Sequence, residues 1–189
     1  EERRGPAQKG FHPRRRGAEM ASMTRMGFDD LLAANREYSR TFTDGGFDGI
    51  ARAGVAVLTC MDSRIEPLSM IGLHLGDAKI LRTPGGRITT DAMIGMILGV
   101  HLLQVNRIMI IPHTRCAMAS GDDAAIADNV FKATGRDIHG MILGATPDQQ
   151  AGLRFDVARL RNHPMIKDLA VEIGGFLYDV DTGALTQIL

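Results

Sequence analysis

Apolar and polar residues follow two different spacings along the chain. Short runs rich in apolar residues predict strands; they cover 55–59, 78–83 and 107–112. Apolar residues spaced three or four positions apart predict helices, at 28–42, 66–77, 89–103 and over most of 114–163, with a break near 144–150. The segment 171–188 has the pattern of a terminal hairpin.

This alternation predicts an α/β fold with a mostly parallel central sheet flanked by helices. A C-terminal antiparallel hairpin and an N-terminal helical arm complete the prediction. In sheets of this kind, ligands bind outside the carboxyl ends of the strands. We therefore expect the chemistry of the protein where the strands 55–59 and 107–112 end.

The first 26 residues differ from the rest of the chain. They lack apolar periodicity, are rich in Gly, Pro and Arg, and carry a formal charge of +4 against −4 for the remainder. This composition predicts a disordered basic tail at 1–26, with a nucleic-acid or targeting arm as the alternative. Residues 27–189 are expected to form a single domain. The net charge of zero argues against nucleic acid as a partner.

Hydropathy and cysteine usage bear on the location. We find no apolar stretch typical of a signal peptide, and the longest apolar run, 92–103, is shorter than the ~20 residues that span a bilayer. We therefore expect no membrane association and a cytoplasmic location. In a reducing compartment the two cysteines indicate metal binding or catalysis more than a disulfide.

Candidate chemistry follows two of the predicted strands. The stretch "VAVLTCMDSR" places Cys60, Asp62 and Arg64 at the end of one strand, and "PHTRC" places His113 and Cys116 after another. Two cysteines and a histidine can supply three ligands of a tetrahedral zinc, which leaves a fourth position open, as in catalytic sites. The alternative is that both thiols are ordinary buried residues and that the histidine belongs to the core.

The segments "CMDSR" and "HTRC", with "GDAKILRTPGG" between them, resemble the β-class carbonic anhydrases from about Phe28 to the C-terminus. The resemblance implies one zinc per subunit on Cys60, His113 and Cys116. It also implies reversible hydration of carbon dioxide to bicarbonate and a proton by a zinc-bound hydroxide. A homodimer or a larger homo-oligomer is expected, with the apolar helix at 92–103 in need of cover on more than one side.

The same resemblance gives Asp62 and Arg64 catalytic roles beside the metal. Asp62 can accept a hydrogen bond from the hydroxide and orient it, while Arg64 holds the carboxylate in place and keeps it ionised. Two departures bear on the rate and not on the ligands: Ala117 stands where the family usually has Gly, and Arg115 where an acidic residue is frequent.

Three further interpretations stay open at this point. Gly85 and Gly86 are candidate substrate-binding residues through backbone amides that face an anion such as bicarbonate, or they form only a tight turn. "DTG" at 181–183 is expected to be the turn of the hairpin. The alternative functions are a zinc hydrolase of carbon disulfide or a similar small molecule on the same scaffold, and a non-enzymatic zinc or redox-sensing module.

Overall fold

The computed structural model describes residues 27–189, which fall into two units, 27–45 and 46–189. The tail predicted at 1–26 lies outside the described residues. In the first unit, helix α1 (Asp29–Thr41) confirms the helix predicted at 28–42, with two aspartates in its first turn and Arg40 in its last. Charges in these positions complement the helix dipole. That residues 27–189 form a single domain stays a prediction.

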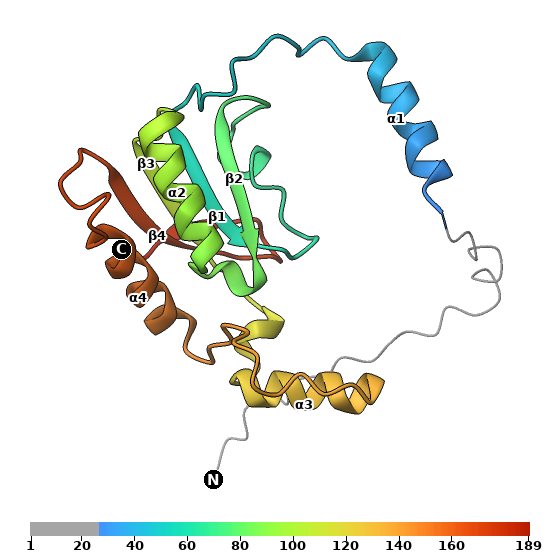
Figure 1. Cartoon of the computed structure of the whole chain (residues 1–189), viewed down its shortest axis with the longest axis vertical. Coiled ribbons are helices and arrows are strands. Elements are labelled where there is room, and N and C mark those ends of the chain that lie inside the picture. Colours follow the sequence, from blue (N-terminus) through green and yellow to red (C-terminus); the bar gives the residue numbers. More distant parts are fainter. Residues whose placement is uncertain (1–26) are drawn as a thin grey trace. The chain divides into compact units, whose positions relative to one another are not determined.

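The second unit is built on a five-stranded sheet in the order β2-β1-β3-β4-β5 (Figure 1). The strands are β1 (Val55–Cys60), β2 (Ala78–Thr83), β3 (Arg107–Ile111), β4 (Glu172–Tyr178) and β5 (Leu185–Gln187). The first four pair in parallel, and β5 pairs antiparallel with β4. The predicted α/β fold with a C-terminal hairpin is confirmed.

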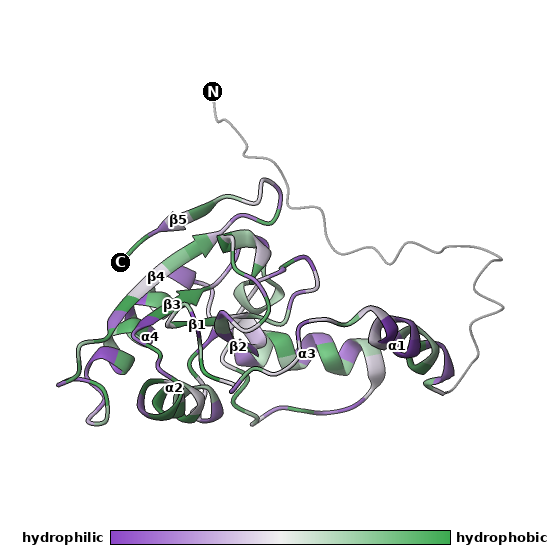
Figure 2. Ribbon diagram, turned by 90° about the horizontal axis from the view of Figure 1, so that it is seen from above, coloured by the Kyte–Doolittle hydropathy of each residue, from purple (hydrophilic) through white to green (hydrophobic). Residues whose placement is uncertain are grey.

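Alternating side chains of the strands divide the core into two layers. Leu58 and Ile110 are fully buried on the face that packs against α2 (Thr90–Leu102) and α4 (Gln149–Arg161). Figure 2 shows the apolar character of β1, β3 and α2. Helix α2 begins where predicted, because the Thr89 side chain accepts a hydrogen bond from the Ala92 N–H at 3.2 Å.

The prediction of a helix at 66–77 is wrong. The segment contains only a short 3-10 turn, Ser69–Ile71, and Gly72 then adopts a left-handed conformation with φ of 70°. A residue in this conformation ends a helix. Met70 and Ile71 still contact the second face of the sheet, around Val57. The apolar pattern therefore indicated correctly that this segment packs against the sheet, but it did not predict the backbone conformation.

The helical stretch predicted at 114–163 consists of two helices with a longer break than expected. Helix α3 (Asp123–Thr134) ends at Gly135, which has φ of 71°. Asp123 stabilises the loop that leads to α4, because its carboxylate accepts hydrogen bonds from the N–H groups of Leu143 and Ala145 at 2.9 and 2.7 Å.

Among residues 27–189, no helix combines the length and apolar character that crossing a membrane requires.

The strand order creates a switch point between β1 and β3. The chain leaves β1 toward β2 on one side, and it leaves β3 toward β4 on the other side. Because the two connections diverge, a crevice opens at the carboxyl ends of these adjacent strands, where ligands bind in sheets of this type. Cys60 and His113 lie at this edge.

Candidate metal centre

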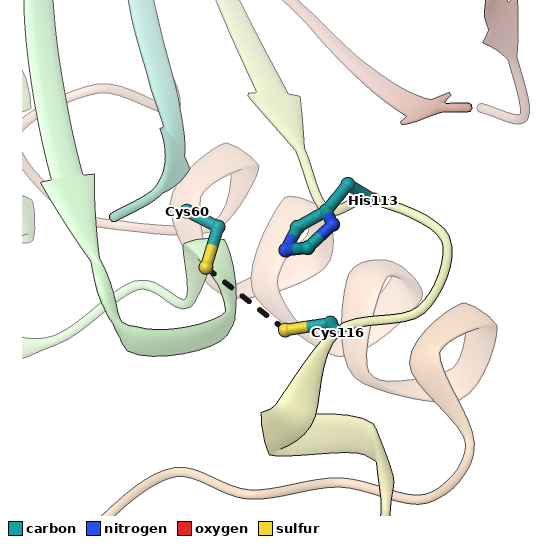
Figure 3. Close-up of side chains that lie close together, drawn as sticks. All are labelled: Cys60, His113 and Cys116. Atoms are coloured by element: carbon teal, nitrogen blue, oxygen red, sulfur yellow. Dashed lines mark hydrogen bonds between the residues drawn. The ribbon is translucent and has the colours of Figure 1, made fainter. Parts of the chain in front are cut away.

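The two cysteines and the histidine that the sequence singled out come together at the switch point (Figure 3). Cys60 is the last residue of β1, His113 follows β3, and Cys116 precedes a 3-10 turn at Ala117–Ala119. Their ligand atoms all lie within 4.8 Å of one another, and all three residues are buried. The two Sγ atoms are 3.9 Å apart, so the thiols are free and not joined in a disulfide.

The His113 ring shows how well this cluster suits a metal. Its Nδ1 lies 2.8 Å from the carbonyl oxygen of Thr114, which can only accept, so Nδ1 carries the proton. This leaves the lone pair of Nε2 directed at the thiols. Within residues 27–189, Nε2 is the one buried side-chain nitrogen or oxygen without a hydrogen-bond partner. Buried polar atoms are almost always satisfied, and a zinc ion would satisfy this one.

The two thiols differ in acidity. A hydrogen bond from the Cys116 thiol lowers the pKa of Cys60 most, against the opposing effect of burial. The same contact with Cys60 raises the pKa of Cys116. Cys60 is thus the first to become a thiolate, the form that binds metal. Two thiolates and a neutral imidazole are a donor set typical of zinc.

Asp62 and Arg64 form a bidentate ion pair beside the cluster. The Arg64 Nε and Nη2 atoms donate to the two carboxylate oxygens of Asp62 at 2.9 and 2.6 Å, and the Arg64 backbone N–H donates to Oδ1 at 2.9 Å. These bonds hold the pKa of Asp62 well below its usual range. Its Oδ2 lies 3.7 Å from His113 Nε2. An ionised carboxylate therefore stands next to the place of the metal.

Two supporting residues received no role in the sequence analysis. Arg82 of β2 donates to the carbonyl groups of Cys60, Asp62 and Ile65 at 3.0, 3.0 and 2.6 Å, which fixes the backbone that carries Asp62. Gln149 donates to the carbonyl oxygen of His113 at 2.9 Å. Arg82 belongs to the "GDAKILRTPGG" segment, so its position was visible but its acceptors were not.

The two departures from the family pattern have different consequences. Ala117 begins the 3-10 turn and does not have positive φ, so its side chain does not strain the backbone. Arg115 does have positive φ, at 55°, and its guanidinium pairs with Asp181 at 2.6 Å. Asp181 belongs to the "DTG" turn, where Gly183 has φ of 74°, so the turn expected at 181–183 is confirmed.

Gly85 and Gly86 lie directly beside Cys60. They follow β2 in a 3-10 turn, Pro84–Gly86, and both have positive φ. Both line a narrow cavity whose walls include Met118 and Leu153. A Cβ atom added at Gly86 would lie 3.3 Å from the Cys60 nitrogen, which places the turn against the end of β1. The tight-turn interpretation fits this geometry, and substrate binding by the two amides stays a prediction.

Comparisons with known proteins agree with this geometry. A family model described as carbonic anhydrase matches residues 55–185. The chain is 27% identical to beta-carbonic anhydrase 1 of Mycobacterium tuberculosis over 85% of this chain and 96% of that protein. It is also 30% identical to a carbon disulfide hydrolase of Acidithiobacillus thiooxidans, over 74% of this chain and 75% of that one.

Among solved structures, a carbonic anhydrase from Streptococcus mutans superposes with a TM-score of 0.78 and 31% identity, covering 86% of this chain and 97% of that one. Fold and site thus match those of a zinc enzyme built on a parallel sheet, with three residues at the switch point that could hold a metal ion. The chain belongs to the β-carbonic anhydrase family, a group of zinc lyases that hydrate carbon dioxide.

Proposed function

We propose that the chain catalyses the reversible reaction of carbon dioxide and water to bicarbonate and a proton, with one zinc per subunit held by Cys60, His113 and Cys116. The unpartnered Nε2 of buried His113, which faces the two thiols, is the observation that carries the ligand assignment. When bound, zinc supplies a Lewis acid that makes water acidic enough to act as a nucleophile near neutral pH.

Asp62 and Arg64 are proposed as the catalytic pair of this reaction. Asp62 is held as a carboxylate by Arg64, so it can only accept hydrogen bonds. It can therefore accept a hydrogen bond from the attacking water or hydroxide and direct the lone pair of its oxygen at the carbon of carbon dioxide. Arg64 acts through Asp62 by fixing the plane of the carboxylate. A site that only held a structural metal would need neither residue.

Gly85 and Gly86, which follow the neighbouring strand β2, are proposed to complete the site. The backbone N–H of Gly85 lowers the pKa of Cys60, so this residue bears on a ligand. Gly86 packs against the ends of β1 and β3, and its amide is proposed for contact with the anion.

Stopped-flow hydration of carbon dioxide with zinc measured on the same sample tests the proposal. We expect activity that follows the zinc content and that falls strongly in Asp62→Asn. Zinc without hydration would refute the activity but not the metal site. Carbon disulfide hydrolysis is assayed in parallel, because a relative with 30% identity is named for that reaction. Activity toward carbon disulfide alone would favour this alternative.

We also propose that the active form is a homodimer or a larger homo-oligomer. The outer face of α2 leaves Ile94, Leu98 and Leu102 at 50, 46 and 69% exposure. A row of apolar side chains at helical spacing costs free energy in water unless another surface covers it.

A cytoplasmic location is proposed as well, since both metal-binding cysteines must stay reduced.

A further inference from the structure

The turn formed by Pro84, Gly85 and Gly86 lies against a metal ligand. A Cβ atom added at Gly86 would lie 3.3 Å from the Cys60 nitrogen and 3.2 Å from the Ile111 carbonyl oxygen. Thr83, the residue before the turn, pairs with Cys60 in the sheet, and its hydroxyl donates to the Arg87 carbonyl oxygen at 2.8 Å. Groups packed around a metal ligand help to orient it, so the position of this turn bears directly on the metal centre.

The residue that follows the turn makes a buried ion pair with α4. The Arg87 Nε and Nη2 atoms donate to the carboxylate of Asp156 at 2.6 and 3.3 Å, and Nη1 donates to the Gly144 carbonyl oxygen at 3.2 Å. Asp156 is only 1% exposed, and it also accepts the N–H of Ile88 at 3.2 Å. The two residues that follow the turn, Arg87 and Ile88, therefore both donate hydrogen bonds to the carboxylate of Asp156.

Helix α4 is shaped to receive the guanidinium. A Cβ atom at Gly152 would lie 3.5 Å from Arg87 Cζ and 2.9 Å from the Thr146 side chain, so a larger residue would crowd this space. The pair lies outside the set of groups that touch the metal or Asp62. A buried ion pair is also weak evidence for stability, because desolvation of the two charges offsets much of their attraction. Its place beside the turn indicates another role.

We propose that Arg87 and Asp156 are positioning residues of the metal centre: their ion pair fixes the Gly85–Gly86 turn against the end of β1, which carries Cys60. The proposal rests on the zinc site described under the proposed function. It assigns to α4, which contributes no ligand, a share in the affinity of the site for zinc.

The test compares the full-length parent with Asp156→Asn and Arg87→Lys. The control is Val157→Ala, which removes buried packing from the same helix without touching the turn. Three quantities are measured: zinc affinity by competition with a chelator, the thiolate-to-metal charge-transfer band of the cobalt(II) protein, and the thermal unfolding midpoint.

We expect zinc affinity to fall about 10- to 100-fold in Asp156→Asn, the range typical of residues that orient a ligand. The charge-transfer band should shift with it. Arg87→Lys should lose less, because lysine keeps the charge but not the bidentate geometry. Val157→Ala should lower the unfolding midpoint and leave zinc affinity and the band as in the parent.

The proposal is overturned if Asp156→Asn loses thermal stability but binds zinc and cobalt like the parent, since the pair would then be structural only. If Asp156→Asn does not fold, Arg87→Lys decides: parent-like zinc affinity and spectrum overturn the proposal, and a loss of affinity with a shifted band supports it. A parent protein that binds no zinc refutes the proposed function itself, and the role of the pair falls with it.

Discussion

Replacing Arg64 by alanine separates the role of Asp62 from that of the metal ligands. The change removes the side-chain hydrogen bonds to Asp62 at 2.9 and 2.6 Å and leaves the one from the backbone N–H. Hydrogen bonds to charged groups contribute about 1.5–3 kcal/mol each when buried. The Arg64 side chain is 39% exposed, so we discount the total to about 1–2 kcal/mol. That corresponds to a factor of about 5–30 in the equilibrium between Asp62 in its present position and Asp62 released from it.

An Asp62 side chain released from Arg64 would need only a small movement to reach the metal position. Its Oδ2 is already 3.7 Å from His113 Nε2, and carboxylate oxygen is a competent zinc ligand. Asp62 would then compete with water for the open position, as the family resemblance also suggests. We expect the hydration rate of Arg64→Ala at neutral pH to fall about 5- to 30-fold, in line with the weakened hold, with zinc still bound.

The pH dependence follows from the sign of the shift. Folding lowers the pKa of Asp62, chiefly through Arg64. The ion pair therefore stabilises the fold fully above the unfolded pKa of about 4 and loses this effect as the pH falls toward the lowered pKa. Asp62 stays ionised from pH 6 to 9. The rate should be low below neutral pH and rise on the alkaline side as water ionises, and the loss in Arg64→Ala should shrink there.

Stopped-flow rates from pH 6 to 9, with zinc measured on each sample, test this prediction. Arg64→Lys is the matched control, since it keeps a charge near Asp62 and should retain part of the rate. Asp62→Asn should also be slow but should show no relief at high pH. If Arg64→Ala keeps both its zinc and the parent pH–rate profile, Asp62 does not close on the metal and Arg64 only supports the loop.

Three further predictions can be tested on the same samples. Cys60→Ser, His113→Ala and Cys116→Ser should each abolish stoichiometric zinc in elemental analysis, while His101→Ala keeps it; full zinc in Cys116→Ser would refute the ligand assignment. Leu98→Glu should weaken the oligomer in light scattering, and a parent that is monomeric and active at micromolar concentration would refute the proposed assembly. Deleting 1–26 should leave zinc content and rate unchanged, and a large loss of either would show that these residues have a role.

The sequence predicted the strands and the ligands best, because both leave local signals. Continuous apolar runs gave β1 and β3 nearly to the residue. In a parallel sheet the carboxyl ends of neighbouring strands share one edge, so the sequence alone could predict that Cys60 and His113 lie close together. The helix expected at 66–77 failed because Gly72 and Gly76 adopt left-handed conformations, and helical spacing of apolar residues does not report them.

Contacts between distant segments left no usable pattern. Arg87 and Asp156 are 69 positions apart, and the only trace in the sequence is an acid on the buried face of α4 next to Val157. Arg82 reads as an ordinary strand residue, although its guanidinium holds the loop after Cys60. Such residues act through backbone carbonyl groups or a single buried partner, and neither has a residue type that a sequence could reveal.

Arg115 shows how the C-terminal hairpin takes part in the metal centre. A non-glycine residue with φ of 55° is strained, and this one lies between two metal ligands. The hairpin holds the conformation: Thr114 donates its N–H to the Tyr178 carbonyl oxygen at 2.9 Å, and Asp181 binds the Arg115 guanidinium at 2.6 Å. Val180 also donates to the Thr114 hydroxyl at 3.1 Å. The hairpin therefore does more than extend the sheet, because it fixes the loop that carries His113 and Cys116.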